Sequence, residues 1–132
     1  MEEENLTKTI IGCAMQVHST LGPGYLEAVY ERALAHELGK AGVAVTCQMP
    51  LRVLYDGVVV GDYIADMLVE GRVILEVKAV QALTPAHEAQ LVSYLTTTGI
   101  EIGLLLNFGA TSLQVRRKYR TYRPRKASPS SA

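Results

Sequence analysis

Two charged residues interrupt an apolar segment that otherwise has the composition of a buried β-strand. Glu76 and Lys78 lie within residues 73–80, and Asp66 lies ten positions before Glu76. Side chains two positions apart on a strand project to the same face, so we expect Glu76 and Lys78 to point together. Unpaired buried charges are costly and occur in core strands mainly when they are paired, bind a metal or take part in a reaction. Two carboxylates beside a lysine suit magnesium-dependent phosphodiester hydrolysis, and a structural Glu–Lys pair or a solvent-facing edge strand is the alternative explanation.

The turn between the two strands decides whether Asp66 and Glu76 share a face of the sheet. The turn signal Glu70-Gly71 separates the strands, and an odd loop such as residues 69–71, ending in a left-handed glycine, places both carboxylates on one side. A two-residue loop places them on opposite sides. We expect the odd loop, because the glycine comes last. The two carboxylates would then be close enough to bind one Mg²⁺ or Mn²⁺ ion, with Lys78 beside it.

The elements that must carry these residues follow from apolar periodicity and turn residues. Apolar residues at helical spacing predict two initial helices, and the following alternating segments predict three strands. A third helix should begin after an N-cap at Thr84 and end at Gly99, and two more strands follow it. The predicted elements are helices over 6–17 and 25–38, strands over 43–54 (broken at 49–50), 58–68 and 73–80, a helix over 84–98, and strands over 100–108 and 112–117. The order ααβββαββ predicts an α/β (α+β) fold with a mixed central β-sheet flanked by helices.

The composition is that of one compact domain. The chain has 132 residues, 48% of them hydrophobic, and no internal repeat or linker. We therefore expect a single domain over residues 1–123 and a disordered basic, Ser- and Pro-containing tail over 124–132. No apolar run approaches the roughly 20 residues of a membrane span, and the amino terminus lacks the layout of a signal peptide. These features predict a cytoplasmic protein that does not associate with membranes.

Charge is distributed unevenly along the chain. The formal net charge is zero, but all 13 acidic residues lie at or before Glu101, whereas seven of the 13 basic residues lie between Arg116 and Lys126. A basic segment that includes Tyr119 can neutralise phosphates and stack on bases, which indicates nucleic acid as a partner. A solubilising tail that folds against the acidic body is the alternative. Three residues of this segment are candidate substrate contacts: Arg116, Arg117 and Lys118.

A motif near the amino terminus connects these residues to a known family. Residues 24–30 read Gly-Tyr-Leu-Glu-Ala-Val-Tyr and match the pattern GxxExxY. The chain over residues 10–119 resembles the family named after this motif, a branch of the PD-(D/E)XK nuclease-like superfamily. The resemblance implies a restriction-endonuclease-like fold, with an acidic residue on the second core strand and E-x-K on the third. Asp66 and Glu76-Val77-Lys78 match these positions. Ala65 replaces the proline of the eponymous motif, which shapes backbone rather than chemistry.

Two further matches assign residues on helices. Glu27 matches the helical glutamate that serves similar nucleases as an additional metal ligand, and its spacing from Tyr30 and Leu34 places it on the face expected to look toward the core. Residues 90–94 are similar to the QxxxY motif of the exonuclease-like branch, in which the crossover helix faces the site. Gln90 and Tyr94 are one helical turn apart, so the match is geometrically feasible.

Together these observations predict metal-dependent hydrolysis of phosphodiester bonds in nucleic acid, with DNA as the expected substrate. The expected metal is Mg²⁺ or Mn²⁺, bound by Asp66, Glu76 and Glu27, with Lys78 as the catalytic lysine and Gln90 as an organiser of the site. Further candidate substrate contacts are Tyr94, His87 and Tyr30. The alternative is a non-catalytic nucleic-acid-binding or protein-assembly module that retains the fold. Because a chain of this size offers a small footprint, homodimerisation or an unidentified protein partner is also expected.

Overall fold

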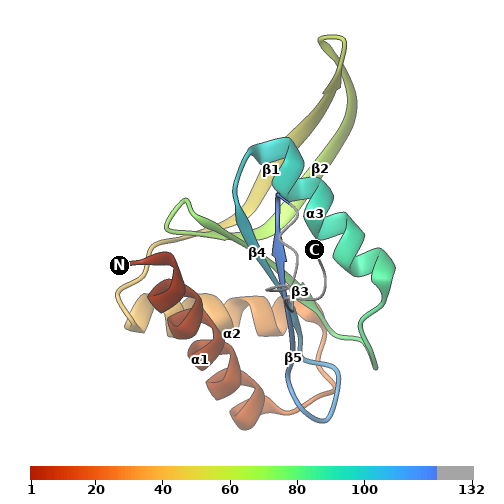
Figure 1. Ribbon diagram of the computed structural model, residues 1–132. Helices are drawn as coiled ribbons and strands as arrows, with labels where there is room; N and C mark the ends of the chain where they lie inside the picture. The colour runs from red at the N-terminus through yellow and green to blue at the C-terminus, as the bar shows by residue number, and fades with distance from the viewer. Residues whose placement is uncertain (122–132) are drawn as a thin grey trace, which may run out of the picture.

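The computed structural model describes residues 1–121 and has the element order ααβββαββ (Figure 1). The elements are α1 (Glu3–Leu21), α2 (Glu27–Lys40), β1 (Val45–Tyr55), β2 (Val58–Val69), β3 (Val73–Lys78), α3 (Pro85–Thr98), β4 (Ile102–Asn107) and β5 (Gln114–Tyr119). The fold class and order therefore agree with the sequence prediction. Tyr122, Arg123 and the expected tail over 124–132 lie outside the described residues. No helix within residues 1–121 is long and apolar enough to cross a lipid bilayer.

The strands form one mixed sheet in the order β1-β2-β3-β4-β5. Neighbouring strands are antiparallel except β3 and β4, which run parallel because α3 provides the crossover between them. Strand β4 is buried along its whole length, and β3 is buried up to Val77. Both are covered by helices on their two faces, which explains why their sequences read as continuous apolar runs.

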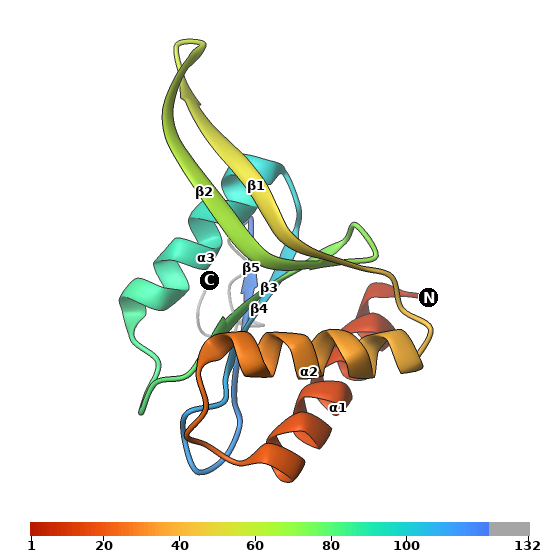
Figure 2. The same ribbon diagram turned by 180° about the vertical axis from the view of Figure 1, so that it is seen from behind.

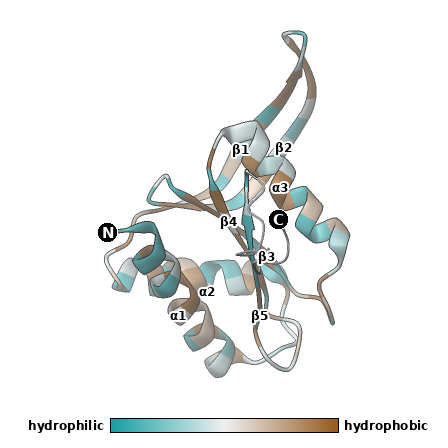
Figure 3. Cartoon of the chain, in the orientation of Figure 1, coloured by the Kyte–Doolittle hydropathy of each residue, from teal (hydrophilic) through white to brown (hydrophobic). Residues whose placement is uncertain are grey.

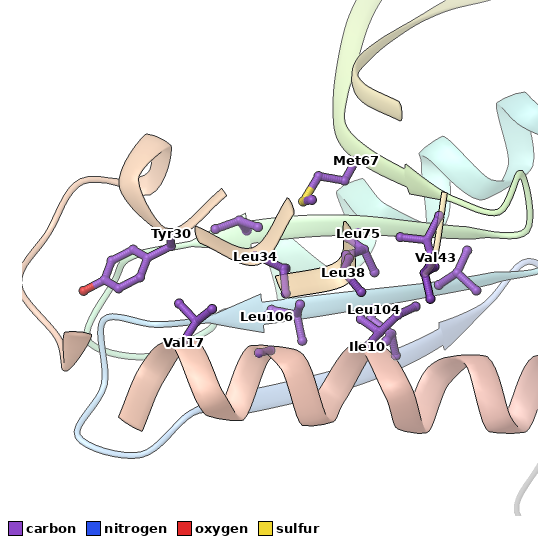
Figure 4. Packing of buried hydrophobic residues seen from close by; sticks show 14 of the residues in the cluster. Ile10, Val17, Tyr30, Leu34, Leu38, Val43, Met67, Leu75, Leu104 and Leu106 are labelled. Carbon is purple, nitrogen blue, oxygen red and sulfur yellow. The ribbon is translucent and has the colours of Figure 1, made fainter. Parts of the chain in front are cut away.

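Helices cover the sheet on both sides (Figure 2). On one face, α1 and α2 contribute Ile10, Val17 and Leu34 to a core that includes Leu75 and Leu104 of the central strands (Figure 4). On the other face, α3 packs a smaller cluster against the sheet, which contains Ile74, Leu91, Tyr94, Leu95 and Leu105. Figure 3 shows apolar colouring along the central strands and mixed colouring on the helices. Burial of these apolar side chains is the main stabilising contribution to the fold.

Strands β1 and β2 continue past the sheet as a protruding hairpin (Figures 1 and 2). Strand β2 pairs with β3 only over residues 67–69, so the remainder of β2 is paired with β1 alone. Large apolar side chains of this arm are 44–70% exposed: Leu54, Tyr55, Val58, Val59, Val60, Tyr63 and Ile64. The point at which β2 leaves β3 is referred to below as the fork.

The segment that follows β3 is held by the buried side chain of Asn107. Its Oδ1 accepts hydrogen bonds from the backbone N–H groups of Val80 and Gly109, both at 3.0 Å, and its Nδ2 donates to the Val80 carbonyl at 2.9 Å. A Cβ on Gly109 would lie 2.4 Å from the Val80 nitrogen, so only glycine permits this approach. The Phe108 N–H donates to the Lys78 carbonyl at 2.9 Å. These contacts fix the carboxyl end of β3, where Lys78 is located.

We predict that Asn107→Ala lowers the free energy of unfolding by about 2–4 kcal/mol, because it removes three hydrogen bonds to the backbone of Val80 and Gly109, each with a net contribution of about 0.5–1.5 kcal/mol. Urea denaturation measures the change. Asn5→Ala replaces an exposed asparagine of α1 and is the matched control, with an expected change within about 0.5 kcal/mol. Equal midpoints for the two variants would contradict this role of Asn107.

Candidate active site

Asp66 and Glu76 face each other at the fork and exchange contacts with the opposite strand. The β2–β3 ladder ends at Met67 and Leu75, so these two residues occupy the next position. The Asp66 N–H donates to Glu76 Oε2 at 2.8 Å, and the Val77 N–H donates to Asp66 Oδ2 at 2.7 Å. Asp66 Oδ2 therefore takes the place of the carbonyl that a continued β2–β3 ladder would have offered to the Val77 N–H. This reciprocal arrangement keeps the two carboxylates adjacent where the strands diverge.

The hairpin loop before the fork accounts for this juxtaposition. Val69 pairs with Val73, so the loop consists of residues 70–72 and has an odd number of residues, as expected. The loop begins at Glu70, one residue later than predicted from the sequence, and Gly71 is its middle residue. Glu70 and Gly71 both adopt positive φ, 54° and 66°. The odd loop places Asp66 opposite Glu76 and not out of register by one residue.

Glu76 is buried, with 4% of its surface exposed. Its pKa is raised to about 8, chiefly by burial and next by the negative charge of Asp66, whereas hydrogen bonding with the Asp66 backbone and the charge of Lys78 act in the opposite direction. Lys78 is half-buried at the end of β3, where it aligns with Asn107 of β4. The three residues therefore lie close enough to influence one another electrostatically.

Helix α2 brings a different glutamate to the fork from the one expected. Glu31 is half-buried, and its pKa is raised to about 7 by burial, by the charge of Asp66 and by hydrogen bonding with the Asp66 side chain. Glu27 is exposed in the first turn of α2, so the expectation that it faces the core is wrong. The two glutamates are one helical turn apart on the same face, and Glu31 is the one that reaches Asp66. That i, i+4 spacing makes Glu31 a candidate in the sequence but does not distinguish it from Glu27.

Gln48 is a second residue that the sequence did not indicate. It lies between Cys47 and Met49, which pair with the residues on either side of Asp66, and its Nε2 donates to Glu31 Oε1 at 3.2 Å. Its φ of 56° is unusual for a residue with a side chain. The predicted break in β1 at 49–50 is thus a local distortion at Gln48 within a continuous strand. Sparsely populated backbone conformations concentrate at functional sites, and this one lies beside the carboxylates.

Helix α3 approaches the fork from the other face of the sheet. Tyr94 packs in the same cluster as Ala65, which precedes Asp66, and Ile74, which lies two positions before Glu76. Burial and the charges of Glu76 and Asp66 together raise the pKa of Tyr94 to about 12, so its hydroxyl stays protonated. Gln90 and Tyr94 line the same cavity, as their one-turn spacing suggested.

Two expected substrate contacts have structural roles instead. Tyr30 is fully buried: its hydroxyl donates to the Gly22 carbonyl at 2.6 Å, and its ring stacks on Phe108 at a centroid distance of 4.8 Å. It cannot reach a substrate, so that expectation is wrong. The His87 Nδ1 accepts from the Thr84 N–H at 3.1 Å in the capping box that begins α3. Its ring therefore satisfies a helix end and is not directed to a ligand.

The basic residues of β5 do not form one patch. Lys118 pairs with Glu88 of α3 at 3.1 Å, whereas Arg117 Nη2 donates to Thr7 Oγ1 of α1 at 3.1 Å. These contacts lie on opposite faces of the sheet, because neighbouring strand residues alternate. Arg116 is exposed. Within the described residues, part of this segment thus pairs with the acidic body, which agrees with the alternative explanation of its charge.

The carboxylates at the fork form a partial set of metal ligands. Across residues 1–121, no group of three or more His, Cys, Asp or Glu side chains is arranged to hold one, so the expected trio of Asp66, Glu76 and Glu27 is not assembled. The Asp66–Glu76 pair still supplies hard oxygen donors, and Mg²⁺ commonly binds through one or two carboxylates with water as the remaining ligand. After burial, the negative charge of Asp66 is the next cause that raises the pKa values of Glu31 and Glu76, and a divalent cation would balance that charge. The donor set therefore suits a hard divalent cation.

In EDTA, we predict that stability falls as the pH rises from about 4.5 to about 8. Folded Glu31 and Glu76 keep their protons up to about pH 7 and about pH 8, whereas an unfolded glutamate ionises near pH 4.5, so the folded state binds more protons in this interval. Glu76→Gln stays neutral at every pH and should flatten the profile. Urea unfolding over a pH series measures the slope. Glu2 is exposed, so the control variant Glu2→Gln should keep the wild-type slope. A wild-type stability that stays constant or rises with pH would show that Glu31 and Glu76 are both ionised in the folded state.

Comparison with known proteins agrees with this geometry. A family model described as the PD-(D/E)XK nuclease superfamily matches residues 4–118, from the first turn of α1 to the penultimate residue of β5. Neither a curated protein nor a solved structure gave a match. The matched segment includes the complete fork and Lys78. Because the match covers most of the chain, the chain belongs to the PD-(D/E)XK nuclease superfamily.

Proposed function

We propose that the protein hydrolyses phosphodiester bonds in nucleic acid, DNA in the first instance, at the β2–β3 fork. The observation that carries this proposal is the pair of adjacent carboxylates, Asp66 and Glu76, which exchange backbone hydrogen bonds beside Lys78. Buried like charges destabilise a fold, so their retention at one point favours a chemical role. The GxxExxY pattern at residues 24–30, just before and within the start of α2, supports assignment to the group named after it.

Each residue has a separate part in this proposal. Asp66 and Glu76 would hold the cation, which supplies polarisation of the scissile phosphate and a lower pKa for bound water. Lys78 stabilises the negative charge that develops on the phosphate oxygens. Glu31, in place of Glu27, orients Asp66 through their hydrogen bond. Tyr94 presents a neutral hydroxyl next to the carboxylates, and Gln90 lies one turn before it on α3.

The activity has a direct test. With Mg²⁺ or Mn²⁺ present, the wild-type protein should cleave DNA, and Glu76→Gln or Lys78→Ala should each reduce the rate by about a hundredfold or more, because each removes charge stabilisation at the reacting phosphate. Gel assays on labelled single-stranded and duplex DNA measure the rates. Glu37→Gln, whose partner on α2 is the surface residue Lys40, is the matched control and should cleave normally. Cleavage in EDTA, or full cleavage by Glu76→Gln, would contradict the proposal.

Metal binding has a test that is independent of cleavage. Millimolar Mg²⁺ or Mn²⁺ should raise the melting temperature of the wild-type protein, because a ligand that binds only the folded state stabilises it by mass action. The increment should disappear in Glu76→Gln and persist in Glu37→Gln. Thermal denaturation with and without each ion measures the shift. An unchanged wild-type melting temperature would remove the support for a cation at the fork.

A second candidate function follows from the protruding hairpin. A two-stranded arm is marginally stable in water, and this one exposes seven large apolar side chains. Its charged residues include the mutually paired Arg52 and Asp62, so it has no excess of positive charge for phosphates. Strand β1 is an edge of the sheet and can pair with its copy across a two-fold axis. If the protein is a non-catalytic assembly module, we therefore expect it to form a homodimer through this arm. Analytical ultracentrifugation would then show a dimer, and the same protein would not cleave DNA.

A further inference from the structure

A cavity of about 460 Å³ lies between the base of the hairpin and α3. The hairpin contributes Tyr63, and α3 contributes Gln90, Tyr94 and three hydroxyl residues, Ser93, Thr96 and Thr97. In both views α3 runs alongside the base of the hairpin (Figures 1 and 2). The cavity is therefore built from two elements that are far apart in sequence. The roles proposed above for Gln90 and Tyr94 do not explain why Tyr63 and the hydroxyl residues are gathered there.

The aromatic residues of the cavity provide a stacking surface. The Tyr63 and Tyr94 rings lie 5.7 Å apart between centroids and are tilted by 49°. Tyr94 is buried, but Tyr63 is 45% exposed, so part of its ring is available to a ligand. Stacking of a nucleobase on such a ring contributes substantially to the binding of unpaired strands and requires little sequence preference. The exposed ring thus suits a flat aromatic ligand.

The polar groups of the cavity select the kind of aromatic ligand. The hydroxyls of Ser93, Thr96 and Thr97 donate to helix carbonyls one turn earlier, at 3.0, 3.0 and 2.9 Å. Because their protons are already used, these oxygens can act toward a ligand only as acceptors. No lysine or arginine belongs to the lining that the described residues form, so a phosphate is not favoured there. The three acceptor hydroxyls therefore favour an uncharged ring that carries an amino group.

The cavity adjoins the fork through Tyr94. That residue lines the cavity, packs with Ala65, and is close enough to Asp66 and Glu76 for their charges to raise its pKa. A strand whose base occupies the cavity therefore has its backbone next to the carboxylates. A base within a duplex is stacked on both sides and cannot present its face to Tyr63 without leaving the helix.

We infer that this cavity binds one unpaired nucleobase with an exocyclic amino group, stacked on Tyr63, and thereby directs the fork to single-stranded or frayed nucleic acid. The inference rests on the proposed hydrolysis for its biological meaning. The binding of the base is a separate event, since it requires neither a cation nor cleavage.

Binding of short oligonucleotides to the full chain in EDTA tests the cavity without cleavage. Fluorescence anisotropy should show oligo(dC) binding more tightly than oligo(dT), a pyrimidine strand with a carbonyl in place of the amine. Tyr63→Ala should weaken oligo(dC) binding by about tenfold, the loss expected for one stacked base, and leave duplex binding unchanged. Tyr63→Phe keeps the ring and should retain the affinity. Tyr55→Ala, at the exposed tip of the same hairpin, is the matched control and should bind normally.

A spectroscopic readout separates stacking from a change in folding. The emission of 2-aminopurine, a fluorescent base with an exocyclic amine, should be quenched when an oligonucleotide containing it binds the wild-type protein and Tyr63→Phe, but not when it binds Tyr63→Ala. A preference for oligo(dT), or equal affinity and quenching for Tyr63→Ala and the wild type, would overturn the inference.

The outcomes also distinguish this inference from the proposed hydrolysis. If oligo(dC) binding depends on Tyr63 but no DNA is cleaved with Mg²⁺ or Mn²⁺, the cavity is confirmed and the hydrolysis fails. If cleavage depends on Glu76 but single-stranded binding is indifferent to Tyr63, the hydrolysis stands and the cavity assignment is wrong.

Discussion

The reciprocal hydrogen bonding of Asp66 and Glu76 across the fork is the interaction on which the rest of the structure depends. Where β2 leaves β3, the backbone N–H groups of Asp66 and Val77 donate to the two carboxyl groups. The same contacts leave the buried carboxyl group of Glu76 next to the half-buried carboxyl group of Asp66. One pair of side chains thus satisfies the backbone where two strands diverge and forms the centre of the candidate site.

This arrangement stores unfavourable electrostatic energy in the folded protein. Glu76 and Glu31 both have raised pKa values, and burial is the first cause for each. The surrounding structure is rigid enough to tolerate this, because Asn107 holds the end of β3 and the apolar clusters cover both faces of the sheet. Proteins commonly accept lower stability at a site that must bind a charged ligand. A divalent cation at the fork would remove most of the repulsion.

The sequence was most informative where a local pattern determines the structure. Alternation, capping residues and turn glycines predicted the order of elements, the mixed sheet and the odd loop that aligns Asp66 with Glu76. It was less informative where distant segments meet. Helical spacing alone did not show that Glu31, and not Glu27, reaches Asp66, because that depends on how α2 lies across the sheet. The position of Tyr63 against α3 likewise depends on the curvature of the hairpin, which no local pattern encodes.

The proposed hydrolysis requires the Asp66–Glu76 pair to hold a divalent cation. A crystal structure of the full chain grown with Mn²⁺, with anomalous scattering data collected to locate the ion, tests this requirement most directly. We expect an anomalous peak in coordinating contact with an oxygen of each carboxylate, with water as the remaining ligand. The absence of such a peak at saturating Mn²⁺, with both carboxylates still bound to the backbone N–H groups of Asp66 and Val77, would contradict it.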